Sequence, residues 1–184
     1  MIPTSIIRLT LLITVMCGAA LPTTPSRAAS FIDEIRIGLL YHDLGVWSDS
    51  SSEQGIDYNA ELIFSPSWPL LGGTIRPVAG FSLNGGGGTS KVYGSAVFEY
   101  IWNNGMFIDL GFGLAIHNGE IDGQQTADNN LLGSPVLFRV SIESGFAFTN
   151  HHRVSLMFDH VSNGYLADPN EGLDTLGIRY GYRF

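Results

Sequence analysis

Three residues that can together hydrolyse an ester lie near the C-terminal end of the chain. His160 and Ser162 occur in the stretch His160-Val161-Ser162-Asn163-Gly164, and Asp174 follows after a polar segment. A serine hydroxyl becomes nucleophilic when a histidine takes its proton, and a carboxylate orients that histidine and stabilises its charged form. Asn163 or a nearby backbone N–H could stabilise the resulting oxyanion. These residue types predict acyl-transfer chemistry, provided that the fold brings them together.

The N-terminal segment predicts export. Arg8 is followed by an apolar run from Leu9 to Leu21 and then by prolines and small residues, which is the pattern of a cleaved signal peptide. The run is short for a membrane-spanning helix. We therefore expect residues 1–29 to be a signal peptide and residues 30–184 to form the mature domain. The single cysteine, Cys17, lies in the signal, so we expect no disulfide and no cysteine chemistry in that domain.

Composition limits the class of protein. Charged residues make up only 14% of the 184 residues and hydrophobic ones 45%, with 23 glycines, which is unusual for a soluble enzyme of this size. A secreted β-rich domain and a membrane β-barrel both fit. The formal net charge of −8 becomes more negative once Arg8 and Arg27 are removed, so nucleic acid is not an expected partner.

The elements that must position the three residues are strands. Apolar and polar residues alternate with period two in segment after segment, most clearly from Met106 to His117. This pattern predicts eight strands: Glu34–His42, Ile56–Phe64, Thr74–Asn84, Val92–Trp102, Met106–His117, Val136–Phe148, Arg153–Ser162 and Leu173–Phe184.

The polar face of these strands decides between the two classes. It carries many glycines and charged residues, among them Arg36, Glu61, Arg139, Glu143 and Arg179, whereas the opposite face is broad and rich in Phe, Leu and Ile. Both faces are explained if the apolar one meets lipid and the charges pair inside a narrow barrel. Closure also removes unpaired strand edges, which hydrocarbon does not tolerate. We therefore predict an all-β, eight-stranded antiparallel transmembrane β-barrel of the outer-membrane type, too narrow for a pore.

Strand parity predicts where the three residues lie. His160 and Ser162 share parity with the apolar residues of their strand, and Asp174 shares parity with those of the last strand. All three should therefore lie on the lipid-facing wall near the outer rim, with Asp174 meeting His160 across a hairpin. Ionisable residues are rare in such places and suggest function. The alternative is that they are ordinary polar residues at the membrane interface.

The C-terminal quarter resembles a known family, the outer-membrane lipid A 3-O-deacylases of the PagL type. The resemblance rests on His160-Val161-Ser162-Asn163, on Pro169-Asn170-Glu171-Gly172-Leu173-Asp174 and on Tyr180-Gly181-Tyr182-Arg183-Phe184. Earlier parts of the chain resemble the family only in their eight-stranded plan.

This resemblance implies catalytic roles for His160, Ser162 and Asp174, with Asn163 at the oxyanion hole and Gly164 and Asn170 in support. Two features depart from the family. Its acid is typically Glu, one methylene longer than Asp174, so Asp174 needs a closer backbone approach to His160. Its glycine two residues after the Asn is replaced here by Tyr165, because Gly164 follows Asn163 directly.

The expected function is removal of an ester-linked acyl chain, at the 3-O position, from lipid A of lipopolysaccharide. It would take place in the bacterial outer membrane, with the active site near the outer leaflet, no cofactor and no metal. His42 and His117 are interpreted as interior polar residues rather than metal ligands. The sequence leaves a homodimer open. The alternative function is a non-catalytic barrel with a structural or adhesive role.

Overall fold

The structure is a computed structural model that describes residues 30–48, 53–124, 126 and 128–184. The signal peptide predicted for residues 1–29 lies outside the described residues and stays a prediction. Within those ranges there is no helix of the length and apolarity needed to cross a membrane.

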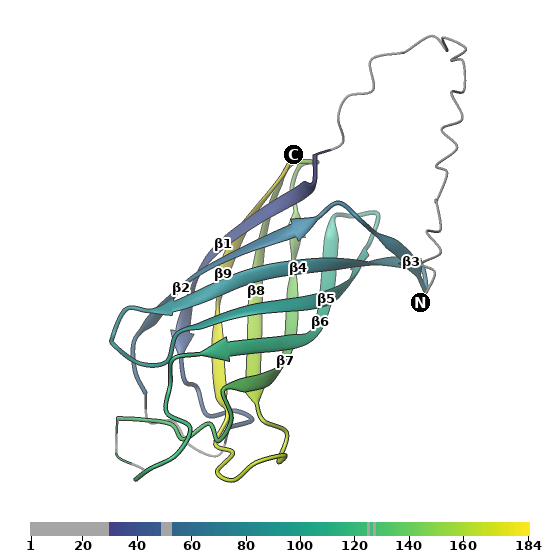
Figure 1. Ribbon diagram of the computed structural model, residues 1–184. Coiled ribbons are helices and arrows are strands. Elements are labelled where there is room, and N and C mark those ends of the chain that lie inside the picture. The colour runs from purple at the N-terminus through teal and green to yellow at the C-terminus, as the bar shows by residue number, and fades with distance from the viewer. Residues whose placement is uncertain (1–29, 49–52, 125, 127) are drawn as a thin grey trace, which may run out of the picture.

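The chain forms one antiparallel sheet whose strands tilt around a barrel (Figure 1). Consecutive strands pair with one another except for β2 and β3, β1 pairs with β9, and a further pairing of β2 with β4 completes the ring. The strands are β1 (Ile32–His42), β2 (Ile56–Phe64), β3 (Trp68–Leu70), β4 (Gly73–Asn84), β5 (Lys91–Ile101), β6 (Met106–His117), β7 (Val136–Ala147), β8 (His152–Ser162) and β9 (Leu173–Arg183).

The predicted all-β, eight-stranded antiparallel barrel is confirmed, with β1, β2 and β4 to β9 as its eight strands. One connection is more than a turn. The stretch from Ser65 to Gly72, whose prolines at positions 66 and 69 favour a short turn, contains β3, which pairs with Gly73–Ile75. Leu71 and Gly72 have φ angles of 47° and 83°. Positive φ at both central residues of a two-residue hairpin loop matches the twist of the flanking strands, so the hairpin extends beyond the ring.

The two ends of the barrel differ. The C-terminus and the start of β1 lie at one end with the short turns, and the longer loops lie at the other (Figure 1). We call the latter the loop end; its connections are 43–55, 85–90, 118–135 and 163–172. Because β8 runs toward the loop end and β9 returns from it, the end of β8 and the start of β9 both lie there.

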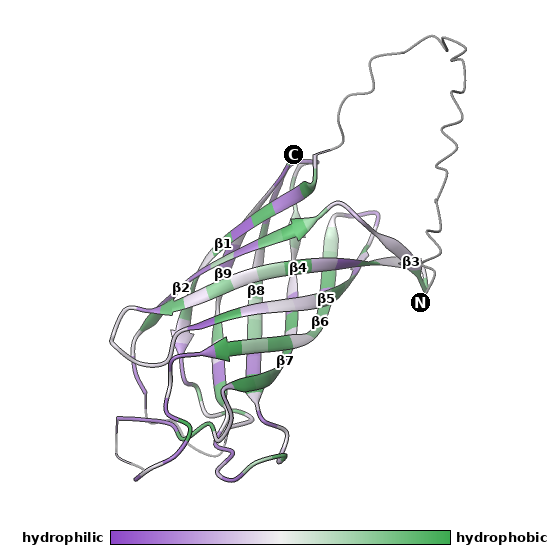
Figure 2. Cartoon of the chain, viewed as in Figure 1, coloured by the Kyte–Doolittle hydropathy of each residue, from purple (hydrophilic) through white to green (hydrophobic). Residues whose placement is uncertain are grey.

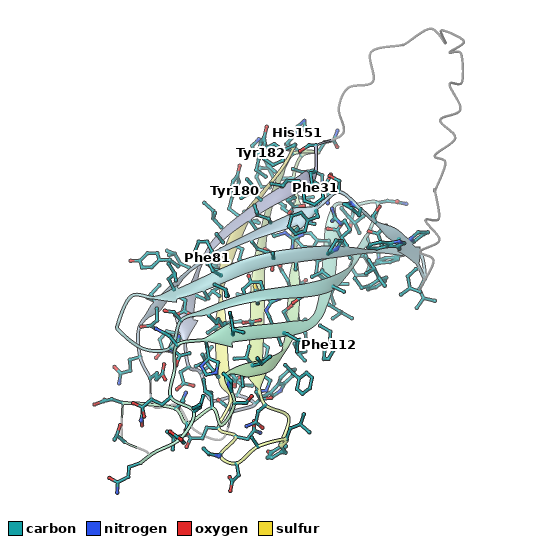
Figure 3. The ribbon with its side chains drawn as sticks, viewed as in Figure 1. Phe31, Phe81, Phe112, His151, Tyr180 and Tyr182 are labelled. Carbon is teal, nitrogen blue, oxygen red and sulfur yellow. The ribbon has the colours of Figure 1, made fainter. Side chains whose placement is uncertain are left out.

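The outer wall is apolar, as predicted. Residues of alternate parity are exposed along every long strand, for example Ile178 at 69% and Phe112 at 61%. Hydrophobic and hydrophilic positions alternate along the ribbons in Figure 2. Figure 3 shows Tyr180, Tyr182 and His151 at the end where the C-terminus lies, which suits an aromatic girdle.

The barrel interior is filled with paired charges. Arg36 contacts Glu34 and Asp109 at 2.6 Å each, and also contacts Glu143 at 2.8 Å. Arg179 joins Glu143 to Glu61 at distances of 2.6 and 2.8 Å. Burying such charges is tolerated only when each finds a partner. The ion pairs explain why the strands carry charged residues on their inward parity.

An apolar cluster lies inside the barrel beside the loop end. It contains Tyr93, Ala115, Leu132, Leu137, Val161 and Leu173. Leu132 comes from the loop 118–135 and is fully buried. Apolar burial of this residue stabilises the loop against the barrel by roughly 1.5–3 kcal/mol. Leu132 is thereby held beside the end of β8 and the start of β9.

Candidate active site

The pairing of β8 with β9 places His160 directly opposite Asp174. Opposed side chains on one face of an antiparallel pair have Cβ atoms roughly 4.5–5.5 Å apart. The register therefore supplies the close backbone approach that the short aspartate side chain requires. Ser162 lies two residues beyond His160, on the same face of β8.

Hydrogen bonds connect the three side chains in series. His160 Nδ1 lies 2.6 Å from Asp174 Oδ1, and His160 Nε2 lies 3.1 Å from Ser162 Oγ. An ionised carboxylate can only accept, so Nδ1 carries the proton and Nε2 is left to accept from the serine hydroxyl. This is the tautomer in which a histidine can take a proton from serine.

Exposure differs among the three residues. The side chain of His160 is 14% exposed and that of Asp174 is fully buried, while Ser162 is half-buried. The sequence placed all three openly on the outer wall. Asp174 has the outward parity of β9, but the connection after β1 folds across it: Leu44 N–H donates to the backbone carbonyl of Asp174 at 3.0 Å.

That connection contributes contacts that the sequence analysis missed. The backbone N–H groups of Val46, Trp47 and Ser48 all donate to Asp174 Oδ2, at 2.7, 2.6 and 2.9 Å. The Trp47 ring packs edge-on against His160, with ring centroids 5.6 Å apart. The apolar pair Val46-Trp47 between Gly45 and a polar stretch was the available signal, but strand periodicity does not show which part of the protein a loop contacts.

Asn163 organises the connection between β8 and β9. Its Nδ2 donates to the carbonyls of Leu132 and Pro169 at 3.1 and 2.8 Å, and its backbone N–H donates to Asn170 Oδ1 at 2.8 Å. Its side chain is buried, with the inward parity of Val161. The donors of Asn163 are thus engaged by these two loops rather than free for a substrate oxygen, and Asn170 holds the Asn163 backbone.

Two glycines shape the space around Ser162. Gly164 and the following Tyr165 have φ angles of 65° and 61°, so the chain turns sharply after Asn163. Gly172 has φ 73°, and a Cβ there would lie 3.2 Å from His160 Cε1 and 3.6 Å from Ser162 Cβ. Any side chain at position 172 would therefore fill the space beside both residues.

His42 lies within the loop end but makes different contacts. Its ring nitrogens bond to Asp57 at 2.7 Å and to Glu53 at 2.9 Å. Burial alone would raise the pKa of Glu53, but hydrogen bonds from His42, Thr89 and Asn130 outweigh it and lower the pKa to about 2. His117 instead contacts the Ser134 carbonyl at 2.8 Å. In the described part of the chain, no group of three or more His, Cys, Asp or Glu residues is arranged to hold a metal ion.

Comparisons with known proteins agree with this architecture. The model of the family described as "Lipid A 3-O-deacylase (PagL)" matches residues 35–183. The lipid A deacylase PagL of Bordetella bronchiseptica is 32% identical over 92 residues, which is 49% of each chain. That of Pseudomonas aeruginosa is 34% identical over 74 residues, or 40% of each. The chain thus spans about half the length, or less, of these curated relatives.

Solved structures show the same fold. The crystal structure of the outer membrane enzyme PagL aligns with a TM-score of 0.62 and 24% identity, covering 82% of this chain and 99% of that one. Neisserial surface protein A aligns with a TM-score of 0.50 and 10% identity, covering 82% and 96%.

Proposed function

The chain belongs to the lipid A 3-O-deacylase (PagL) family, and from this membership we propose that it is an outer-membrane esterase acting on lipid A. It removes the ester-linked acyl chain at the 3-O position, and Ser162, His160 and Asp174 carry out the reaction. The observation that carries the proposal is the continuous hydrogen-bond series from Asp174 through His160 to Ser162.

The reaction has two halves. His160 Nε2 takes the Ser162 proton while Oγ attacks the ester carbonyl carbon, and the protonated imidazole then gives that proton to the departing sugar oxygen. This leaves the acyl group on Ser162 and a free sugar hydroxyl. Water, activated by His160, attacks the acyl-enzyme and releases a 3-hydroxy fatty acid. No cofactor takes part in this scheme.

The oxyanion requires donors close to Ser162. The donors of Asn163 are used within its own loop, by Asn170 and Pro169, and by the carbonyl of Leu132 in the loop 118–135. Gly164 and Tyr165 supply the next backbone N–H groups, and these make no hydrogen bond among the described residues. We assign the oxyanion to the Gly164 N–H, with Asn163 and Asn170 holding that turn in place.

The substrate reaches Ser162 from the side. His160 and Ser162 share the parity of Leu156 and Phe158, which are on the apolar outer wall of β8. An acyl ester held in the outer leaflet could meet Ser162 without leaving the membrane. We propose that the loop end faces outward, and that the signal peptide of residues 1–29 is removed before insertion.

The test is hydrolysis of lipopolysaccharide by the purified barrel and by a Ser162→Ala variant. Wild type should release 3-hydroxy fatty acid, detected by mass spectrometry, and the variant should release at least about a thousandfold less. Ser144→Ala is the matched control, because Ser144 is an exposed serine on the neighbouring strand β7. Equal release from wild type and Ser162→Ala would overturn the assignment of hydrolysis to this site, and no release from either protein would favour the alternative, a non-catalytic barrel.

A further inference from the structure

The Asp174 carboxylate is held by a segment far from it in sequence. Val46, Trp47 and Ser48 donate their successive backbone N–H groups to the one oxygen Oδ2, and Ser48 Oγ lies 3.2 Å from the same atom. Oδ1 is left to His160. Successive N–H groups that converge on one point form a concave anion site, which favours the ionised carboxylate. The carboxylate therefore has one orientation, with Oδ1 toward the imidazole.

The Trp47 side chain packs against His160, the residue that the Asp174 carboxylate orients. Its ring meets His160 edge-on at an interplanar angle of 72°, and it meets Phe158 edge-on with centroids 4.9 Å apart. Edge-to-face aromatic contacts stabilise one relative ring orientation. Trp47 is still 53% exposed, so only part of the indole is used in these contacts.

The segment is itself anchored on both sides. Before it, Leu44 N–H bonds to the Asp174 carbonyl, and after it Glu53 N–H bonds to Asp43 Oδ2 at 3.0 Å. Glu53 in turn contacts His42 at 2.9 Å. These hydrogen bonds fasten the described residues on both sides of the segment to the barrel end, which is what a preorganised positioning element requires.

We propose that Val46, Trp47 and Ser48 form a positioning segment that sets the geometry of Asp174 and His160. The backbone N–H groups of the segment fix the orientation of the Asp174 carboxylate. The Trp47 ring fixes the plane of the His160 imidazole, so that Nε2 stays within hydrogen-bonding distance of Ser162 Oγ. This inference rests on the proposed function, because it concerns the same three residues. The inference adds to the site a segment from the loop after β1, the strand that pairs with β9 on the side away from β8.

Three substitutions of Trp47 separate the contribution of its ring from that of its backbone N–H. Trp47→Phe keeps an aromatic edge and the N–H, Trp47→Ala keeps only the N–H, and Trp47→Pro removes both. We expect kcat close to wild type for Phe, about tenfold lower for Ala and about a hundredfold lower for Pro, with KM little changed. Trp68→Ala is the matched control, because Trp68 has a similar exposure of 57% but lies in β3, away from the loop end.

A second measurement needs no lipid. A fluorophosphonate probe forms an Oγ–phosphorus bond with an activated serine and releases fluoride, so its labelling rate reports activation of Ser162. Labelling should fall in the same order as kcat, and heat-dependent gel mobility should show that each variant is a folded barrel. If Trp47→Pro does not fold, the comparison of Trp47→Phe with Trp47→Ala still tests whether the ring positions His160.

The outcomes are distinct. Unchanged kcat and labelling in Trp47→Ala would overturn the inference, and so would equal losses in Trp47→Ala and Trp47→Phe. A raised KM with unchanged labelling would also overturn it, since the ring would then contact substrate rather than position His160. Activity that survives Ser162→Ala would instead refute the proposed function, whatever the Trp47 variants do.

Discussion

Replacing Asp174 by Asn should inactivate the enzyme through the wrong histidine tautomer. In Asp174→Asn the side-chain amide must put its oxygen at one of the two carboxylate oxygen positions and its NH₂ group at the other. The position of Oδ2 faces three backbone N–H donors at 2.6 to 2.9 Å, so only the oxygen fits there. The NH₂ group must then face His160 Nδ1 at the position of Oδ1, 2.6 Å away in the wild type.

An NH₂ group at that position changes what His160 can do. It donates to Nδ1, so the imidazole proton moves to Nε2 and the ring can no longer accept the proton of Ser162. A forced tautomer of this kind lowers kcat by roughly 10⁴-fold in a serine protease. This corresponds to about 5 kcal/mol of lost transition-state stabilisation. We expect a loss of the same order here.

The assay is release of 3-hydroxy fatty acid from lipopolysaccharide, with folding checked by gel mobility. Asp174→Ala is the informative comparison, because it removes the carboxylate but places no donor against Nδ1, so both tautomers of the His160 imidazole remain accessible. We expect the Ala variant to keep more activity than the Asn variant. An Asn variant with more than about a tenth of wild-type kcat would refute the tautomer mechanism, as would an Ala variant that is the weaker of the two.

Two further predictions concern the barrel and its loop end. In Gly177→Ala the new Cβ would lie 2.0 Å from the Leu39 carbonyl oxygen, so the variant should lose about 1–3 kcal/mol or more in urea unfolding. Gly94→Ala, whose Cβ would lie 3.9 Å from its nearest neighbour, is the control and should unfold like wild type. Glu53 has a pKa lowered to about 2, so its stabilisation of the loop end is complete above its unfolded pKa of about 4.3 and disappears as the pH falls toward 2. Pepsin should therefore cleave the wild-type loops increasingly from pH 4 to 2 and cleave Glu53→Gln already at pH 4; identical profiles would contradict this role.

Residue alternation alone determined the barrel. Side chains on successive strand positions point to opposite faces, so an apolar parity and a charged parity together specify a lipid-facing wall and a paired interior. The same parity placed His160, Ser162 and Asp174 on one face, and antiparallel pairing placed the last two strands side by side. Strand bounds agreed within a few residues because the pattern ends where the turn residues begin.

The surroundings of Asp174 were decided only by the tertiary structure. Closure of the barrel pairs β1 with β9, which brings the loop after β1 to the start of β9. The conformation of that loop then directs three N–H groups of Val46, Trp47 and Ser48 at a carboxylate more than a hundred residues later in the chain. The engagement of Asn163 with Leu132 and Pro169 likewise depends on how two loops meet. Loops have no periodic pattern that reports their partners, so alternation could place the acid on the correct strand face but not show that a distant loop would bury it.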